Sequence, residues 1–259
     1  MVFLNWVLPI ALSAVLLVLL FLSFSFTKTK YTSREITMAA VCCAFSYTLY
    51  MVSKSFIPSM PFGGQITLFA YLPLCLYAYA FGARKGIIAG IVTALLRLSI
   101  GTLYILHPLS FIFDYILGFI CIGLTGIFKN TIEKRVTPQS KRFWVYAKER
   151  NLAFPAGIVI VALTRYLIGT LSGILFWWDS IKLIDGTKFK PEALNAANFK
   201  AIFVYSAFLY NPYILVDMAI VVIAAAVLCA TKQTSRLLKI MRPETVQNNP
   251  TANNGRDET

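Results

Sequence analysis

The chain is poor in charged and metal-binding side chains. Only 14% of its 259 residues are charged, and His107 is its single histidine, whereas an average soluble domain is about 25% charged. A histidine-based metal site or a Ser-His-Asp triad would have to be built around that one residue. The phosphate-binding pattern G-x-x-x-x-G-K-[ST] is also absent, so any ATP-driven process would need another subunit to hydrolyse the nucleotide.

Hydrophobic residues, in contrast, make up 58% of the chain and gather in long runs. A membrane-spanning helix needs about 20 mostly apolar residues. The spans that we expect are 6–26, 36–52, 66–80, 86–105, 109–128, 153–178 and 203–230. We therefore predict an all-α integral membrane protein. The first run has no basic flank of the kind that precedes a signal-peptide core, so residues 1–31 are expected to form an uncleaved N-terminal transmembrane helix.

The net charge of +13 is mostly explained by topology. With the N-terminus outside, seventeen of the 24 lysines and arginines fall in cytoplasmic segments, five fall in outer segments and two fall inside spans. The positive-inside rule favours this orientation, with the C-terminus in the cytoplasm. We therefore expect a lipid bilayer and no nucleic acid as the partner of the basic residues, and the polar tail 232–259 is predicted to be disordered.

Five cysteines lie inside the expected spans, without metal-ligand spacing, and are interpreted as small packing residues. They are Cys42, Cys43, Cys75, Cys121 and Cys229. No metal or other cofactor is expected.

Four ionisable residues interrupt the spans: Arg97, Asp114, Arg165 and Asp217. Charges at such positions are costly and suggest function. At a rise of about 1.5 Å per residue, the depths of these side chains allow two ion pairs, Arg97 with Asp114 and Arg165 with Asp217. One interpretation is that these pairs hold helices together and bind no ligand. The shallower Asp114 is the better ligand candidate. The two acids differ in depth by about 13 Å at that rise, which argues against an aspartyl enzyme.

Polar and aromatic side chains gather near the depth of Asp114. Gly169, Gly173 and Trp177 are spaced by four, so they share one helix face that offers a bare groove for a flat ligand. The other members of the cluster are Tyr104, His107, Tyr115, Trp178, Tyr205, Tyr210 and Asn211. An interfacial aromatic belt explains part of this set, but it explains neither Asp114 nor Asn211. A carboxylate flanked by aromatic rings indicates a pocket for a small planar cation.

Several linked motifs resemble the thiamine-specific substrate-binding subunit (S-component) of energy-coupling factor (ECF) transporters. These motifs are Gly-Gly-Gln-Ile-Thr-Leu at 63–68, Leu-Pro at 72–73, Tyr-Ile-Leu-His-Pro at 104–108, Asp-Tyr at 114–115, Ser-Gly-Ile-Leu-Phe-Trp at 172–177, Tyr-Ser at 205–206 and Tyr-Asn at 210–211. The resemblance covers about residues 34–231. Gly169 departs from it, because the family often has histidine there, and the loop 53–65 lacks a tryptophan that some members use as a lid.

This resemblance implies a six-helix S-component bundle over 32–231 in a bacterial cell membrane, with no enzymatic activity of its own. Such a subunit takes up thiamine from outside and delivers it by associating with a membrane-embedded coupling subunit and two ATPases. The site residues that carry over are Tyr104, Asp114, Tyr115, Gly173, Trp177, Tyr205 and Asn211. Ala40 and Ala44 are the implied docking residues, although internal packing explains that small-residue face equally well. Another vitamin as ligand and a non-transporting scaffold remain alternatives.

Overall fold

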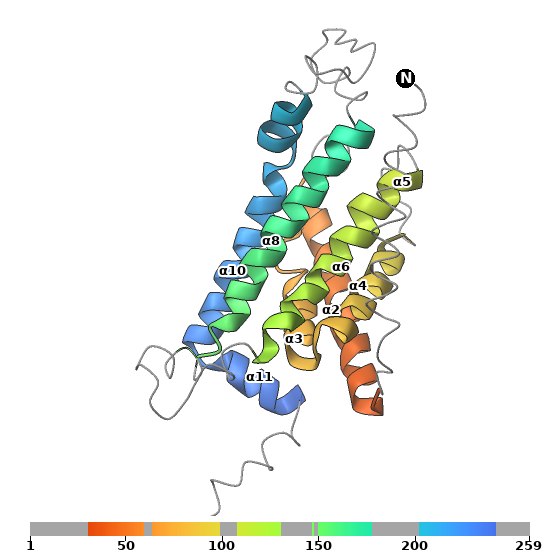
Figure 1. Ribbon diagram of the computed structural model, residues 1–259. Helices are drawn as coiled ribbons and strands as arrows, with labels where there is room; N and C mark the ends of the chain where they lie inside the picture. Colours follow the sequence, from red (N-terminus) through yellow and green to blue (C-terminus); the bar gives the residue numbers. More distant parts are fainter. Residues whose placement is uncertain are drawn as a thin grey trace, which may run out of the picture.

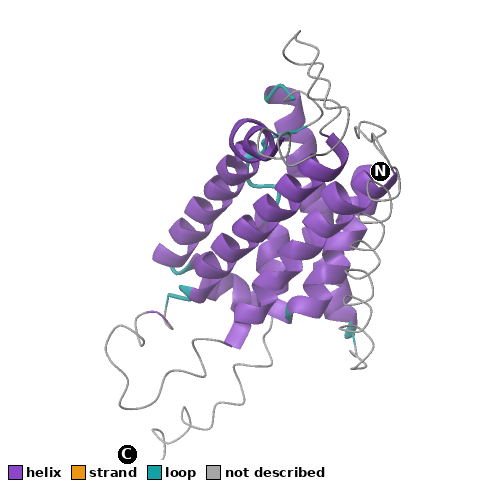
Figure 2. Ribbon diagram, turned by 45° about the horizontal axis from the view of Figure 1, so that its top comes forward, coloured by secondary structure: helices purple, strands orange, loops and turns teal. Residues whose placement is uncertain are grey.

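The computed structural model describes residues 31–59, 64–98, 108–130, 147, 150–177 and 202–241. Within these ranges the chain is helical and contains no strand, and its long helices run side by side as a bundle (Figures 1 and 2). The elements are α2 (Ser33–Phe56), α3 (Leu72–Phe81), α4 (Ala83–Leu98), α5 (Pro108–Phe111), η2 (Ile112–Leu117), α6 (Gly118–Gly123), η3 (Leu124–Asn130), α8 (Ala153–Ser172), η5 (Gly173–Trp177), η7 (Tyr205–Tyr210), α10 (Pro212–Ala230) and α11 (Gln233–Met241). The expected span 6–26 lies outside the described residues.

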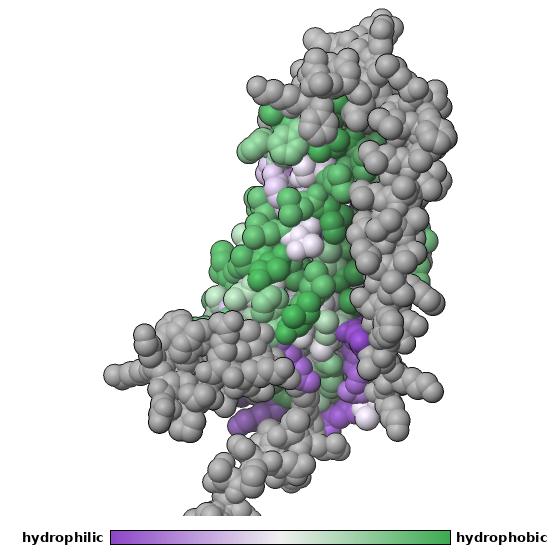
Figure 3. Space-filling view, viewed as in Figure 1, coloured by the Kyte–Doolittle hydropathy of each residue, from purple (hydrophilic) through white to green (hydrophobic). Residues whose placement is uncertain are grey.

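Four helical stretches in the described part are long and apolar enough to cross a membrane: Ser33–Phe56, Ile112–Lys129, Ala153–Trp177 and Ile202–Ala230. Each coincides with an expected span, so the prediction of an all-α membrane protein is confirmed. Apolar side chains also dominate the described outer surface of the bundle, whereas hydrophilic residues gather at its lower end (Figure 3). This distribution suits a bundle surrounded by lipid, because the exposed apolar surface then contacts acyl chains instead of water.

Local sequence signals account for the helix boundaries. Thr32 and Glu35 form a capping box at the start of α2, in which each side chain accepts a hydrogen bond from the other residue's backbone N–H. Pro73 and Pro212 lie in the first turns of α3 and α10, where the missing N–H of proline costs nothing. Gly82 ends α3 with a φ of 101°, a backbone conformation that glycine adopts readily.

The expected span 66–80 is helical only from Leu72 onward. Residues 64–71 instead form an irregular segment, in which Leu68 has a φ of 49°. Non-helical backbone at membrane depth is tolerated where protein covers it or where it lines a cavity. Ala70 and Tyr71 are buried, whereas Phe69 is exposed, and the carboxylate of Asp217 binds the backbone at Thr67. Burial inside the bundle therefore accounts for part of the apolar composition of 66–71.

Glycines allow α4 to pack closely on the helix formed by α6 and η3. A Cβ on Gly90 would lie 2.5 Å from the carbonyl oxygen of Phe119, and one on Gly86 would lie 3.0 Å from the Cα of Gly123. The small-residue face of Gly86, Gly90 and Ala94 therefore serves internal packing. The five cysteines are free and buried, as predicted for packing residues.

The structure differs from the expected disordered tail over Gln233–Met241, which form α11. This short helix lies across the lower end of the bundle (Figure 1). Asn151 Nδ2 donates to Ser235 Oγ at 2.8 Å, and Arg34 Nη2 donates to the carbonyl oxygen of Ile240 at 2.6 Å. The disorder prediction is therefore wrong for this segment, because its polar composition suits an end-capping amphipathic helix with Thr234 and Met241 buried.

Candidate functional site

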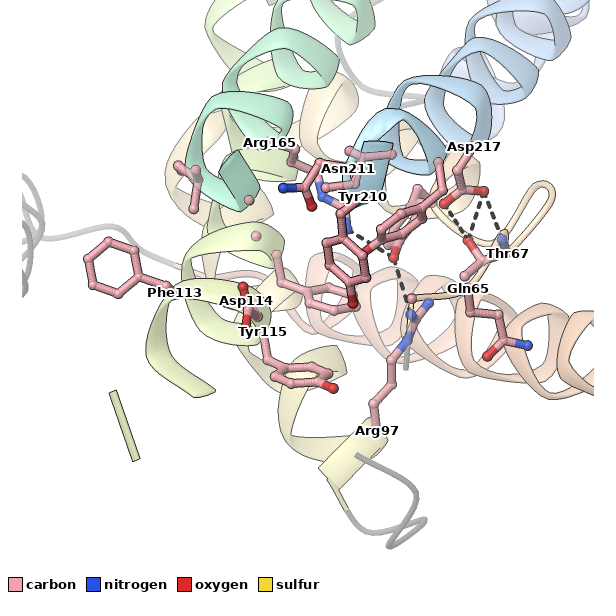
Figure 4. Close-up of a pocket in the computed structure, with 18 of the residues that line it drawn as sticks. Gln65, Thr67, Arg97, Phe113, Asp114, Tyr115, Arg165, Tyr210, Asn211 and Asp217 are labelled. Atoms are coloured by element: carbon pink, nitrogen blue, oxygen red, sulfur yellow. Dashed lines mark hydrogen bonds between the residues drawn. The ribbon is translucent and has the colours of Figure 1, made fainter. Parts of the chain in front are cut away.

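One cavity collects all four ionisable residues that interrupt the spans. Its walls come from α2, the irregular segment 64–71, α4, the helix formed by η2 and α6, the helix formed by α8 and η5, the end of η7 at Tyr210 and the start of α10 (Figure 4). About 100 Å³ of it is open to the centres of water-sized molecules, whereas a single water needs only about 10–15 Å³. The cavity is therefore large enough to admit the polar groups and ring atoms of a small organic molecule.

Asp114 and Trp177 face each other across two helices that line the cavity. Trp177 Nε1 donates a hydrogen bond to Asp114 Oδ2 at 2.9 Å. Asp114 lies in the π-helical segment η2, and Trp177 ends the π-helical segment η5. Single π-helical turns are frequent at functional sites because they change which side chains face inward. The pair therefore presents a carboxylate beside a large aromatic ring.

Two arginines converge on one phenol. Arg97 Nη1 and Arg165 Nη2 donate to Tyr71 Oη, at 3.2 Å and 3.1 Å. The Arg97 guanidinium carbon also lies 3.9 Å from the ring centroid of Tyr50 and 4.7 Å from that of Phe119, within cation-π range. Its Nε and Nη2 have no hydrogen-bond partner among the described residues, so aromatic ring faces provide much of the environment of this buried cation.

Asp217 binds the irregular segment instead of an arginine. Its Oδ1 accepts from the backbone N–H of Thr67 at 2.8 Å, and its Oδ2 accepts from Thr67 Oγ1 at 3.1 Å (Figure 4). Ser53 Oγ, on α2, donates to the carbonyl oxygen of Thr67 at 3.0 Å. Thr67 therefore ties α2, the irregular segment and α10 together at the cavity wall.

Both expected ion pairs are absent. Among the described residues, neither Arg97 with Asp114 nor Arg165 with Asp217 lies within 4.0 Å, and Lys85 with Glu35 is the ion pair that forms. The prediction matched residues by depth alone, and that is why it was wrong. The four charged side chains instead form hydrogen bonds with Tyr71, Thr67 and Trp177.

Four of the predicted site residues line the cavity: Asp114, Tyr115, Trp177 and Asn211. Gly173 lies beside it but is covered by Ser206, whose Oγ occupies the place where a Cβ would stand. The groove expected over Gly169 and Gly173 is therefore filled at both glycines, because Ile214 Cδ1 lies 2.7 Å from the Cβ position of Gly169, although Gly169 still lines the cavity. Tyr205 belongs to η7, but its side chain, like all of Tyr104 and His107, lies outside the described residues.

Sequence reasoning missed several residues that line the cavity, among them Tyr50, Gln65, Thr67, Tyr71 and Tyr213. Tyr71 is 3% exposed, although it is a polar side chain beside an apolar run. A buried tyrosine normally needs a partner for its hydroxyl, and that is the one signal that would have pointed to it. The others are ordinary polar or aromatic residues whose position depends on the irregular path of segment 64–71.

The side chains that line the cavity suit the binding of a ligand. Within the described part of the chain, no group of three or more histidine, cysteine or acidic residues is placed to hold a metal ion. The cavity instead combines a carboxylate, an amide, ring faces and guanidinium groups. Such a set can hold a planar ligand with one positive charge and hydrogen-bonding edges.

Comparisons with known proteins agree with this description. The family model described as Thiamine transporter protein (Thia_YuaJ) matches residues 36–237. The chain is 29% identical to the thiamine transporter ThiT of Bacillus subtilis strain 168 over 201 residues, which are 77% of this chain and 91% of that protein. It is 30% identical over 143 residues to the thiamine transporter ThiT of Lacticaseibacillus paracasei, covering 53% of this chain and 65% of that protein.

A solved structure also shares the fold. The structure of ThiT from Listeria monocytogenes aligns with a TM-score of 0.50 at 21% identity, and the alignment covers 78% of this chain and 97% of that one. The family match extends over most of the chain, from α2 to the first residues of α11, and includes every helix that lines the cavity. The chain therefore belongs to the thiamine transporter protein family.

Proposed function

We propose that the protein captures thiamine in the cavity beside Asp114 and Trp177. The observation that carries the proposal is the hydrogen bond of 2.9 Å between these two side chains, because it holds a carboxylate against a large ring at the cavity wall. Thiamine has an aminopyrimidine that can stack on an aromatic face and donate N–H groups to a carboxylate. Its thiazolium cation is attracted to the other ring faces. The relatives named above as thiamine transporters support the same ligand.

We propose further that this chain works as an S-component, which receives energy from a separate coupling subunit and two ATPases. Ala40 and Ala44 lie on one exposed face of α2, four residues apart. Small residues at this spacing let a second helix approach closely. We also propose an orientation in the membrane in which the N-terminus lies outside and the cavity opens toward the extracellular side. It places most lysines and arginines in cytoplasmic segments, as the positive-inside rule favours.

Direct titration tests the ligand assignment. Purified protein is titrated with thiamine while tryptophan fluorescence and calorimetric heat are recorded. We expect saturable quenching at micromolar ligand or below, and we expect Trp177→Phe to remove most of the quenching while some heat of binding remains. A wild-type protein that shows neither signal with thiamine, but binds a different planar vitamin, would overturn the thiamine assignment.

A further inference from the structure

Asn211 is held by a chain of two hydrogen bonds that leads back to α8. Ser206 Oγ lies 3.0 Å from the carbonyl oxygen of Thr170, and Asn211 Nδ2 lies 3.0 Å from Ser206 Oγ. Ser206 and Asn211 are each only 2% exposed. Ser206 does not line the cavity, so its burial keeps water away from its hydroxyl, and these bonds determine the orientation of the Asn211 side chain.

Only one assignment of donors and acceptors fits the Thr170 carbonyl, the Ser206 hydroxyl and the Asn211 amide. A backbone carbonyl only accepts, so the single hydroxyl proton of Ser206 must go to Thr170. The side of the Ser206 oxygen that faces Asn211 then offers lone pairs. Only the NH2 end of the amide can donate to them, and therefore the carbonyl oxygen of Asn211 must point the other way.

Two glycines of the helix formed by α8 and η5 show where that oxygen points. The Cβ position of Gly173 lies 3.4 Å from Asn211 Nδ2, whereas the Cβ position of Gly169 lies 3.4 Å from Asn211 Oδ1. Gly169 lines the cavity, and Gly173 is covered by Ser206. The amide therefore lies along the helix, with its nitrogen at the covered end and its oxygen at the cavity end.

We infer that Ser206 is a positioning residue that makes Asn211 a hydrogen-bond acceptor toward the cavity, so that the site selects a ligand presenting an N–H group there. This inference rests on the proposed function. Thiamine carries an amino group on its pyrimidine, whereas oxythiamine carries a carbonyl oxygen at the same position. Asn211 Oδ1 accepts from the first and faces the second as two acceptors without a proton between them.

Without the Ser206 hydroxyl, the Asn211 amide loses the acceptor that fixes its orientation. In Ser206→Ala the Asn211 amide is able to rotate by half a turn and donate to the carbonyl of oxythiamine. The affinity for thiamine then falls while the affinity for oxythiamine is unchanged or rises. A purely structural defect would weaken both ligands by the same factor.

The test measures the ratio of thiamine to oxythiamine affinity by calorimetry on the full-length protein. In wild-type protein we expect thiamine to bind more tightly, and in Ser206→Ala we expect the ratio to fall by about fivefold, the factor that one net hydrogen bond contributes. Ser46→Ala is the matched control, because the Ser46 hydroxyl is also buried but has no hydrogen-bond partner among the described residues and does not line the cavity. Its ratio is expected to equal that of the wild type.

Asn211→Leu provides a second route if Ser206→Ala does not fold. It removes the acceptor itself, so it is expected to lower the ratio by a similar factor. The inference is overturned if the ratio stays at the wild-type value in whichever of these variants folds, while thiamine still binds. If wild-type protein binds neither ligand, the proposed function is what fails. Equal binding of both ligands by wild-type protein leaves the proposed function standing and overturns the role of Ser206.

Discussion

The indole N–H of Trp177 donates to the carboxylate of Asp114 at 2.9 Å and so joins η5 to η2 across the cavity. This bond holds the carboxylate in place at the cavity wall, where the N–H group of the proposed ligand would reach it. Asp114→Asn keeps the shape but removes the negative charge. We expect thiamine affinity to fall by about 1.5–3 kcal/mol, the contribution of a charge-assisted hydrogen bond, as measured by calorimetric titration.

Glu35→Gln serves as the control for Asp114→Asn. Glu35 also loses a negative charge in this variant, but it pairs with Lys85 and caps α2 away from the cavity. Its thiamine affinity is expected to match the wild type. An Asp114→Asn protein with unchanged affinity would assign Asp114 to structure alone, as the partner of Trp177.

Asp217 and Thr67 stabilise the irregular segment, and a series of substitutions at this contact separates its parts. Thr67→Val removes only the hydroxyl bond and is expected to cost about 1 kcal/mol. Asp217→Ala removes both bonds and leaves the buried Thr67 N–H without a partner, so a loss of about 3 kcal/mol or more is expected. Thermal or denaturant unfolding of the purified proteins measures these losses.

Ser55→Ala is the control for this series, because Ser55 lies at an exposed position of α2 and its hydroxyl donates to the carbonyl oxygen of Met51 in the same helix. Its stability is expected to remain within about 0.5 kcal/mol of the wild type, as for other surface substitutions. Equal losses for Thr67→Val and Asp217→Ala would show that the backbone bond from Thr67 contributes nothing to stability.

The Thr67–Asp217 contact also shows how far sequence reasoning reached. The spans could be predicted because a lipid environment requires long apolar runs. Asp114, Trp177 and Asn211 could be identified because polar groups inside such runs are costly and stand out. Thr67 and Asp217, in contrast, are 150 residues apart, and Thr67 lies in an apolar run that resembles a helix. Its irregular path depends on the partner that it meets inside the bundle.

The failed ion pairs have the same physical origin. The depth of a residue along a span gives one coordinate of its side chain. It does not give the direction in which the side chain points around the helix axis, or which other polar groups compete to bind it. The hydroxyl of Tyr71 accepts from both arginines, and nothing in the spacing of Arg97 and Arg165 distinguishes such a phenol from a carboxylate. Ser206 was likewise visible as part of a motif, but the positioning role that we infer for it depends on its hydroxyl proton going to the carbonyl oxygen of Thr170.

Two glycines on neighbouring helices should respond in opposite ways to alanine. In Gly90→Ala the new Cβ would lie 2.5 Å from the backbone oxygen of Phe119, which cannot move without separating α4 from α6. A loss of about 1–3 kcal/mol in unfolding free energy is expected. In Gly118→Ala the nearest atom is Arg165 Nε at 3.8 Å, so the better helix propensity of alanine is expected to leave stability unchanged or raise it by up to about 1 kcal/mol.

Both glycine variants are compared by thermal unfolding in the same detergent, which keeps the solvent contribution constant. Equal stabilities would contradict the close approach of α4 to α6 that the structure shows. The comparison is informative because both glycines are buried, but only the surroundings of Gly118 have space for the added methyl group.

Docking of the chain to a coupling subunit is tested most sharply by separating binding from transport. Ala40→Leu and Ala44→Leu enlarge side chains on the exposed face of α2, while the cavity lies on the inner side of the bundle. We expect thiamine affinity to remain at the wild-type value, whereas co-purification with the coupling module and uptake into cells fall at least tenfold. Ala226→Leu, at an exposed position on α10, is expected to change neither. Normal uptake by both α2 variants would assign Ala40 and Ala44 to lipid contact, because a helix that approaches through small residues cannot accept two added branched side chains without moving away.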